Sequence, residues 1–303
     1  MTSVQNAKRL GLGTVQFGAD YGISNARGRL SENEVRGILE YAGQCGITLL
    51  DTASLYGDSE AVLGRSLPAE RGFRIVSKTP AAGNAVVDEA FCLEVEKALY
   101  RSLELLQQPS LYGLLIHDVK DLLKPGGERL LSTLQSFHSK GLVQKIGVSV
   151  YDAAQIDAVL EMFTPHIIQL PLSVADQRLR VSGHLKKLCA CGVEIHARSL
   201  FLQGALLMDP QTLPQHFDPV RQHFTDFGLA AERAGLTRLQ ACLQFAFSLP
   251  EISTALVGVT SQEELAEIVS ACGQSEELAF DADAFALNDE RYTNPLHWPW
   301  TNA

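Results

Sequence analysis

A regular alternation of short apolar runs with segments of helical spacing constrains the fold of this chain more than any other feature. Eight runs rich in leucine and β-branched residues predict β-strands at residues 10–14, 47–51, 74–78, 112–117, 145–150, 167–172, 193–198 and 254–258. Several of them, such as 113–116, are apolar almost throughout. This pattern is typical of strands that are covered on both faces.

The segments between these runs carry the start and stop signals of helices. Ser31 and Glu34 have the spacing of a capping box, and Gly46 follows the same segment where a left-handed turn is needed. Strands that alternate with helices imply right-handed crossovers and a parallel sheet. An open dinucleotide-binding sheet is the main alternative, but Gln16 stands where its fingerprint requires a third glycine. We therefore predict an α/β fold, a single eight-stranded parallel (β/α) TIM barrel, with residues 1–303 forming one domain.

Two segments do not follow this alternation of strands and helices. Residues 209–227 are rich in Pro, His and Phe without a period, and residues 288–303 form an aromatic C-terminal tail. Together with residues 17–21 they are expected to set substrate choice, the first as a loop that encloses the substrate. Surface packing without a functional role is the alternative for both aromatic segments.

Composition limits the class of partner. The formal net charge of −10 argues against nucleic acid and anionic membranes, so a small-molecule substrate is the expected partner. Residues 1–9 lack an apolar stretch, and no later run approaches the ~18 residues that span a bilayer. We expect a cytoplasmic protein that is a monomer or a small homo-oligomer.

The cysteines and histidines do not form a metal-binding pattern. The six cysteines include no C-x-x-C unit, and the eight histidines show no H-x-x-x-H or H-E-x-x-H spacing. We therefore predict no metal site. The closely spaced pair Cys189 and Cys191 is interpreted as buried packing.

Ionisable residues of different types follow three consecutive strands. Asp51 ends the second predicted strand and Tyr56 lies in its loop, while Lys78 and His117 end the third and fourth. Because active sites of such barrels lie at the carboxyl ends of the strands, these side chains should meet on one rim. Each residue alone has a structural explanation, as a cap, a packed ring or a solvated charge. Their joint placement favours catalysis.

The chemistry that these groups suit is proton donation to a carbonyl while a cofactor delivers hydride. A free tyrosine is a poor acid near neutral pH, but a nearby ammonium group such as Lys78 favours the phenolate. Asp51 can pair with Lys78 and keep it charged, and His117 can hydrogen-bond the substrate oxygen. Tyr56 is therefore the predicted general acid.

The stretch around Tyr56 is also a recognisable motif. It reads Asp51-Thr52-Ala53-Ser54-Leu55-Tyr56-Gly57-Asp58-Ser59-Glu60 and is followed by Leu63-Gly64. It strongly resembles the signature of the aldo-keto reductase family. Further matches follow in family order, at residues 12–14, 77–78, 116–117, 147–149, 169–173, 197–199 and 257–258, so that the resemblance spans about residues 10–269.

The resemblance implies a catalytic tetrad and a nicotinamide cofactor. The tetrad would be Asp51, Tyr56, Lys78 and His117. Cofactor contacts are implied for Gly13, Thr14, Asp51, Ser149, Gln169, Arg198, Ser199, Phe201 and Gly258. Among these, Ser149 and Gln169 would bind the nicotinamide carboxamide and Arg198 would lie against the ring.

This chain departs from the family pattern at two places that bear on the cofactor. Val150 stands where many members have Asn, and Glu264 falls at or near a family arginine position. No Lys or Arg occurs between Arg238 and Arg291, although a 2′-phosphate needs a basic partner. The resemblance favours NADP(H), and NAD(H) is possible.

The predicted function is NAD(P)H-dependent reduction of an aldehyde or ketone, or reversible oxidation of a sugar or alcohol, with Tyr56 as general acid. A non-catalytic, nucleotide-sensing regulatory subunit of the same fold is the alternative from another functional class. A barrel lyase or isomerase that uses Lys78 as a Schiff-base nucleophile is a third hypothesis.

Overall fold

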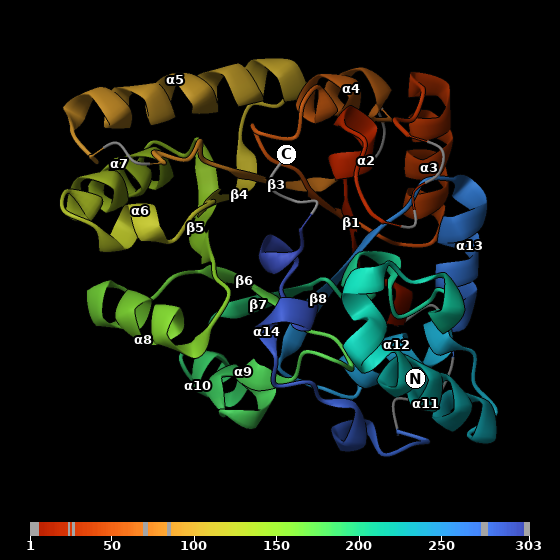
Figure 1. Ribbon diagram of the computed structural model, residues 1–303. Coiled ribbons are helices and arrows are strands. Elements are labelled where there is room, and N and C mark those ends of the chain that lie inside the picture. The colour runs from red at the N-terminus through yellow and green to blue at the C-terminus, as the bar shows by residue number, and fades with distance from the viewer. Residues whose placement is uncertain are drawn as a thin grey trace.

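Eight parallel strands close into a barrel in the computed structural model, which describes residues 6–23, 25, 28–68, 72–83, 86–273 and 278–299 (Figure 1). The strands are β1 (Leu10–Gly13), β2 (Leu49–Asp51), β3 (Arg74–Lys78), β4 (Leu111–Ile116), β5 (Val143–Ser149), β6 (Ile167–Pro171), β7 (Glu194–Arg198) and β8 (Ile252–Gly258). Each strand pairs with the next, and β8 pairs with β1. The predicted (β/α) barrel is thereby confirmed, and every strand overlaps its predicted run.

Helices surround the strands (Figure 1). The longer ones are α3 (Glu32–Gln44), α4 (Ser59–Ser66), α5 (Glu89–Leu106), α7 (Gly127–Ser139), α8 (Ala153–Met162), α11 (Arg221–Arg233), α12 (Arg238–Phe247) and α13 (Gln262–Ala271). The shorter ones are α2 (Val15–Gly18), α6 (Lys120–Leu123), α9 (Arg178–Val181), α10 (His184–Ala190) and α14 (Glu290–Thr293). Short 3-10 turns are η1 (Leu202–Gly204), η2 (Pro210–Thr212), η3 (Gln215–Val220), η4 (Ala282–Phe285) and η5 (Pro295–His297).

Helix α3 shows how local sequence signals set these elements. The Ser31 side chain accepts a hydrogen bond from the Glu34 N–H, and Glu34 accepts one from the Ser31 N–H at 2.9 Å, which is the predicted capping box. Val35 and Ile38 lie on the buried face of the helix. The chain leaves the helix through Gly46 at φ +80°, a conformation that glycine adopts without strain.

The barrel interior is filled by one layer of large apolar side chains. Leu49, Val76, Leu115, Ile167 and Leu256 form this cluster, and each comes from a different strand. The larger core lies outside the barrel, between the strands and the helices that cover them. Because apolar side chains fill the middle of the barrel, its interior offers room for polar side chains mainly at the two ends.

The two aromatic segments pack against each other. Residues 209–227 form η2, η3 and the start of α11, so they have more regular structure than a loop. The buried Phe217 ring contacts Phe224 and Trp298 edge-on, with centroid distances of 5.6 and 5.2 Å. Residues 300–303 of the predicted tail lie outside the described residues. The role of 209–227 as a substrate loop stays a prediction.

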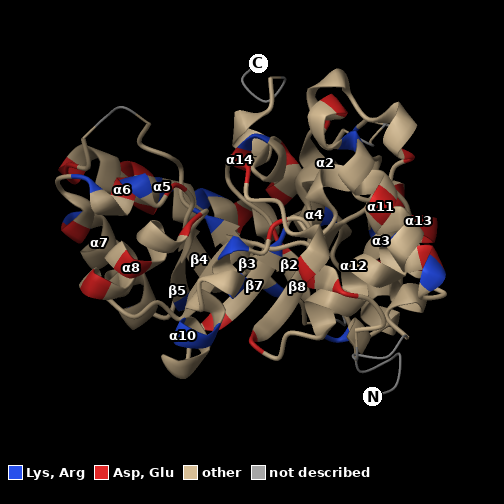
Figure 2. Ribbon diagram, turned by 60° about the horizontal axis from the view of Figure 1, so that its bottom comes forward, with Lys and Arg blue, Asp and Glu red and all other residues tan. Residues whose placement is uncertain are grey.

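The surface carries charges of both signs on the outer helices (Figure 2). Within the described residues, none of the helices combines the length and the apolar character needed to span a membrane. Cys189 and Cys191 are exposed at the end of α10, so the prediction that they are buried is wrong. Leu185 and Leu188 form the buried face of this short helix, and its C-terminal end remains in solvent.

A charged network closes the end of the barrel opposite to the carboxyl ends of the strands. Glu194 accepts hydrogen bonds from Lys145 Nζ, from Tyr112 Oη at 2.8 Å and from His196 Nε2 at 2.8 Å. Burial by itself raises the pKa of Glu194, but the hydrogen bonds from His196 and Lys145 outweigh burial and lower the pKa to about 2. The ionised form of Glu194 therefore stabilises the fold.

This network predicts a pH dependence of stability. Since the pKa of Glu194 is depressed in the folded protein, its contribution is present above the unfolded pKa of ~4.3 and is lost as the pH falls toward 2. We expect wild type to lose about 2 kcal/mol more free energy of unfolding than Glu194→Gln between pH 5 and pH 3, at ~1.4 kcal/mol per pKa unit. Urea titrations at both pH values measure this difference. Glu128→Gln, on the exposed surface of α7, is the control that should behave like wild type.

Candidate active site

A buried ion pair lies at the carboxyl ends of β2 and β3. Lys78 Nζ is 2.8 Å from Asp51 Oδ2, and the two residues are only 2% and 5% exposed. Lys78 also donates to the Thr52 carbonyl oxygen at 2.8 Å, and the Gln169 side chain donates to Asp51 Oδ1 at 2.7 Å. Both charges are therefore paired and further hydrogen-bonded, which burial requires.

Tyr56 and His117 lie beside this ion pair. Lys78 Nζ is 4.9 Å from the centroid of the Tyr56 ring, and the Tyr56 and His117 rings meet nearly at right angles with centroids 6.0 Å apart. Tyr56 comes from the turn before α4, and His117 directly follows β4. The structure thus brings all four residues of the predicted tetrad together.

The electrostatics of the site fix the charge of its members. Burial by itself lowers the pKa of Lys78, but the Asp51 carboxylate and Tyr56 outweigh it and raise this pKa above its ordinary value. Burial, together with the positive charges of Lys78 and Arg198, lowers the pKa of His117 to about 4. At neutral pH Lys78 is therefore charged and His117 is neutral. A Schiff-base lysine needs the opposite shift, so this arrangement disfavours a lyase that uses Lys78.

A close backbone contact holds the turn that carries Tyr56. The turn passes so near Gly18 that a Cβ atom there would lie 2.1 Å from the Tyr56 carbonyl oxygen and 2.3 Å from the Ser59 nitrogen. Gly57, at φ +55°, approaches the Gly18 carbonyl from the other side. Ser59 Oγ donates to the Thr14 carbonyl oxygen at 2.8 Å and joins the turn to the end of β1. The position of Tyr56 thus depends on residues near β1.

Two glycines face each other on the rim between β1 and β8. Gly13 and Gly258 are register partners there, and Gln16 reaches over Gly258, since a Cβ atom on that glycine would lie 2.7 Å from the Gln16 amide nitrogen. Gln16 Oε1 is buried, and none of the described residues donates a hydrogen bond to it. A bound nucleotide could approach the backbone at Gly13 and donate a hydrogen bond to Gln16 Oε1. This arrangement fits the contacts implied for Gly13 and Gly258.

The predicted carboxamide ligands are also neighbours. Ser149 and Gln169 are register partners at the ends of β5 and β6, and both are buried. The amide nitrogen of Gln169 donates to Asp51. The side-chain oxygen of Gln169 therefore remains available to accept a hydrogen bond from another group. Sequence reasoning did not find this link between Gln169 and the ion pair.

Arg198 ends β7 and lies against an aromatic ring that sequence reasoning missed. Its guanidinium carbon is 4.2 Å from the centroid of the Tyr151 ring, and Nη2 donates to the Val150 carbonyl oxygen at 3.2 Å. The only sequence signal for Tyr151 is its place directly after the departure at Val150.

The backbone after β7 is strained. Ser199, Leu202 and Gln203 have positive φ values of 63°, 50° and 52°, which non-glycine residues rarely adopt. The Gln203 amide donates to the Tyr21 hydroxyl at 3.1 Å and so joins this turn to the loop after β1. Phe201, the other predicted cofactor contact in the turn, packs partly buried against the main core. Strained backbone of this kind is common at ligand sites.

Glu264 folds back onto the residues that follow β8. Its two carboxylate oxygens accept hydrogen bonds from the Thr260 N–H at 2.6 Å and from the Thr260 hydroxyl at 2.8 Å. The start of α13 therefore presents a fixed negative charge where the resemblance leads one to expect a basic side chain.

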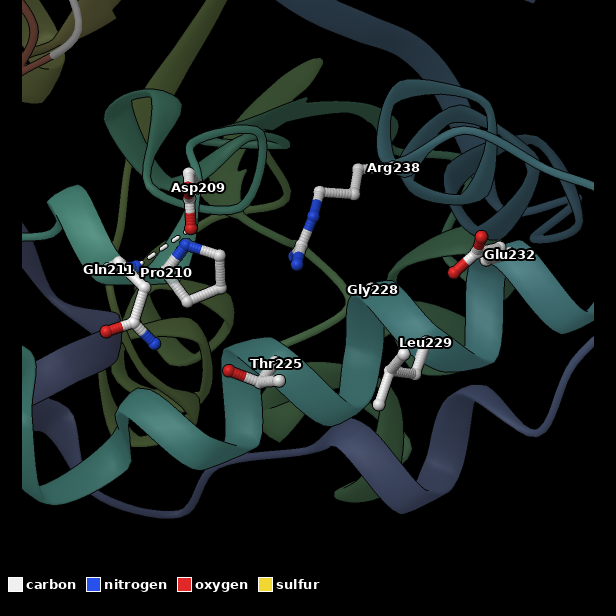
Figure 3. A pocket seen from close by; sticks show the side chains of 8 residues that line it. All are labelled: Asp209, Pro210, Gln211, Thr225, Gly228, Leu229, Glu232 and Arg238. Carbon is white, nitrogen blue, oxygen red and sulfur yellow. Dashed lines mark hydrogen bonds between the residues drawn. The ribbon is translucent and has the colours of Figure 1, made fainter.

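A cavity of about 270 Å³ lies between η2, α11 and the start of α12. Figure 3 shows Arg238 pointing into it, toward Gly228 and the segment that carries Asp209. No tetrad residue lines this cavity. It is therefore separate from the candidate active site.

The contact between Gly18 and the Tyr56 turn predicts a positional effect. Gly18→Ala should displace Tyr56 and reduce kcat/KM for the predicted carbonyl reduction by roughly 10²-fold, the scale of a misplacement of about 1 Å. Steady-state assays on variants whose circular dichroism shows them to be folded measure the effect. Gly72→Ala is the matched control, because a Cβ atom there meets nothing within 4 Å. A Gly18→Ala enzyme within threefold of wild type would contradict this role.

Comparison with known proteins identifies relatives along almost the whole chain. A sequence profile of the Aldo/keto reductase family matches residues 9–290. L-galactose dehydrogenase of Arabidopsis thaliana is 26% identical over 307 residues, which cover 96% of this chain and 94% of that protein. D-arabinose 1-dehydrogenase of Saccharomyces cerevisiae is 26% identical over 179 residues and covers 52% of this chain and 53% of its own length.

Solved structures show the same fold. An aldo-keto reductase from Bacillus halodurans in its holo form has a TM-score of 0.72 at 18% identity, covering 91% of this chain and 89% of that one. A putative aldo-keto reductase from Pseudomonas aeruginosa has a TM-score of 0.65 at 24% identity, with 88% and 90% covered. The family match along the chain confirms the resemblance seen in the sequence, and the chain belongs to the aldo/keto reductase family.

Proposed function

We propose that this protein is an NAD(P)H-dependent oxidoreductase that reduces an aldehyde or ketone, or reversibly oxidises a sugar or alcohol. The observation that carries the proposal is the buried Lys78–Asp51 ion pair beside the ring of Tyr56. A tyrosine next to a fixed, buried cation is suited to donate its proton, because the cation stabilises the phenolate that remains.

Each member of the tetrad has one task. The cofactor, when bound, supplies the hydride. Tyr56 donates its hydroxyl proton to the carbonyl oxygen, and Lys78 stabilises the phenolate. Asp51 keeps Lys78 charged and oriented, and the neutral His117 hydrogen-bonds the carbonyl oxygen. In the direction of oxidation the Tyr56 phenolate accepts the proton instead.

The relatives support this reaction class and suggest a kind of substrate. Both curated relatives are named as sugar dehydrogenases, so a sugar or a related hydroxy-aldehyde is a reasonable substrate class for this chain. A cytoplasmic location and a monomeric or small homo-oligomeric state stay predictions.

The residues that would hold the cofactor fit a nicotinamide nucleotide. Ser149 and Gln169 would bind the carboxamide, and the backbone at Gly13 and Gly258 would lie along the nucleotide. Arg198, at the end of β7, would lie against the nicotinamide. Thr14, Ser199 and Phe201 would complete the contacts around these positions.

The cofactor's 2′-phosphate is the part that this chain is least equipped to bind. A 2′-phosphate near Glu264 would meet a carboxylate that is held in place by Thr260, and residues 239–290 contain no Lys or Arg. Removing the phosphate from water would cost free energy, and this segment has no basic side chain that could compensate for that cost. The family habit favours NADP(H), while the local charges reduce that preference and leave NAD(H) as an option.

Replacing Tyr56 with Phe tests the proposed acid. Tyr56→Phe should lower kcat by about 10²–10⁴-fold and leave cofactor affinity near wild type, because only the proton donor is removed. The assay follows NADPH or NADH absorbance with a panel of aldehydes and sugars. Tyr100→Phe, on the exposed face of α5, is the control. Half of wild-type kcat in Tyr56→Phe would rule out Tyr56 as the acid.

The same assay separates the enzyme from the alternative function. A regulatory subunit would bind NADPH or NADH, as followed by thermal shift, and would turn over no carbonyl compound in the panel. Turnover that depends on Tyr56 would exclude that alternative.

Cofactor preference gives a further prediction. We expect wild type to prefer NADPH over NADH by less than ~100-fold in Kd, which is about 2.7 kcal/mol at ~1.4 kcal/mol per decade, with reversal included. Glu264→Arg should shift the preference toward NADPH by roughly 1–3 kcal/mol, the scale of a charge-assisted hydrogen bond. Quenching of protein fluorescence measures both constants.

Glu264→Gln is the matched control for this prediction. It removes the charge but keeps an acceptor for Thr260, so it should shift the preference in the same direction by less. A wild type that already prefers NADPH by several thousandfold would mean that a basic residue from another segment reaches the phosphate.

A further inference from the structure

Arg198 is a cation at the mouth of the barrel that has no acidic partner among the described residues. No carboxylate oxygen lies within 4.0 Å of its guanidinium anywhere in the part of the chain that the structure describes. Its one hydrogen bond to a described residue goes to the Val150 carbonyl oxygen, through Nη2. The remaining N–H groups of the guanidinium are therefore available to a ligand.

Among the described residues, some other arginines pair with a carboxylate, whereas Arg74 and Arg238, like Arg198, do not. Arg178 pairs with Asp176 and Glu290, and Arg180 pairs with Asp283. Further arginines at positions 29, 65, 221 and 291 also contact a carboxylate. The chain has a net charge of −10 and therefore more carboxylates than basic groups. None of the carboxylates among the described residues forms an ion pair with Arg198.

The charge of Arg198 acts within the candidate active site. It contributes to the low pKa of His117, after burial and the charge of Lys78. Tyr21 interacts electrostatically with Tyr56, Arg198 and Tyr151, so these four residues lie near one another on the rim. Arg198 is half-buried and rests on the Tyr151 ring, which limits the positions that its guanidinium can take.

The charges of the predicted tetrad and Arg198 add up to an excess of one positive charge. Lys78 and Asp51 neutralise each other, and His117 is neutral at pH 7. Arg198 is the remaining charge among these groups. A half-buried cation costs free energy unless an anion compensates it, and a guanidinium matches the two oxygens of a carboxylate or the oxygens of a phosphate.

We propose that Arg198 selects carbonyl substrates that carry an anionic oxygen group, a carboxylate or a phosphate, at a distance from the reacting carbon. The proposal rests on the proposed function, since it names the substrate class of the same site. The carbonyl oxygen lies at Tyr56 and His117, and the anionic end of the substrate reaches the N–H groups at the edge of the Arg198 guanidinium. The flat face of the same guanidinium is the part that would lie against the nicotinamide. Tyr21 and Tyr151 lie near Arg198 on the same rim.

The test compares two aldehydes of the same shape and different charge. 4-Carboxybenzaldehyde is anionic, and 4-nitrobenzaldehyde is its neutral isostere. The ratio of their kcat/KM values, measured by chromatography of the alcohol products, cancels any effect of a variant on the cofactor or on the chemical step. We expect this ratio to fall at least tenfold in Arg198→Met, and Arg198→Lys to retain part of it because the charge remains.

Two controls make the comparison specific. Arg129→Met removes an exposed arginine of the outer helix α7. It should leave the ratio unchanged. The kcat/KM ratio of glyceraldehyde 3-phosphate to glyceraldehyde repeats the comparison for a phosphate. It decides which of the two anionic groups Arg198 prefers.

Binding measured without turnover keeps the inference separate from the proposed function. Calorimetric titration of both benzaldehydes into Tyr56→Phe, with and without Arg198→Met, reports charge recognition even where no aldehyde is reduced. Tighter binding of the anionic partner that disappears in Arg198→Met supports the proposal. Equal ratios in wild type and Arg198→Met for both the carboxylate and the phosphate pair would overturn it, while Tyr56-dependent turnover would leave the proposed function intact.

Discussion

The buried ion pair between Lys78 and Asp51 is the interaction on which the rest of the site depends. Removing two such charges from water costs several kcal/mol per ion, so the pair is tolerable only where every polar atom finds a partner. Thr52 and Gln169 supply the additional hydrogen bonds. Because Gln169 reaches Asp51 from β6, on the far side of the barrel from β2, the pair is complete only when the barrel is closed. Folding and assembly of the site are thus one event.

The parallel barrel separates this site from the network that stabilises its other end. All strands run in the same direction, so their carboxyl ends gather the tetrad while their amino ends gather Glu194, Lys145 and Tyr112. A layer of apolar side chains fills the space between the two polar networks. Low dielectric material around each network strengthens its internal attractions and makes an unpaired member costly.

The fold, and the gathering of the four residues of the predicted tetrad on one rim, were predictable because their signals are local. Strand runs, the Ser31 capping box and the motif around Tyr56 each depend on neighbours in sequence, and strand ends in a parallel barrel converge by topology alone. The contacts that escaped prediction join distant segments through particular side-chain orientations. Gln169 with Asp51, Gln203 with Tyr21 and Glu264 with Thr260 are of this kind. The exposure of Cys189 and Cys191 was not predicted for a similar reason, since composition does not show whether the end of a helix lies in solvent or in the core.

Any recognition of an anion by this chain has to be local. With a net charge of −10 the molecule as a whole repels an anionic cofactor or substrate, but at physiological ionic strength this repulsion is screened over ~8 Å. Contacts within that distance decide what binds. The segment after β8 offers Glu264 and no basic side chain, whereas the end of β7 offers Arg198 without an acidic partner among the described residues. Strained backbone at Ser199, Leu202 and Gln203 directly follows Arg198, and such strain persists only where surrounding contacts enforce it. The positive side of the rim is therefore built into the turn after β7, and the region after β8 opposes extra negative charge.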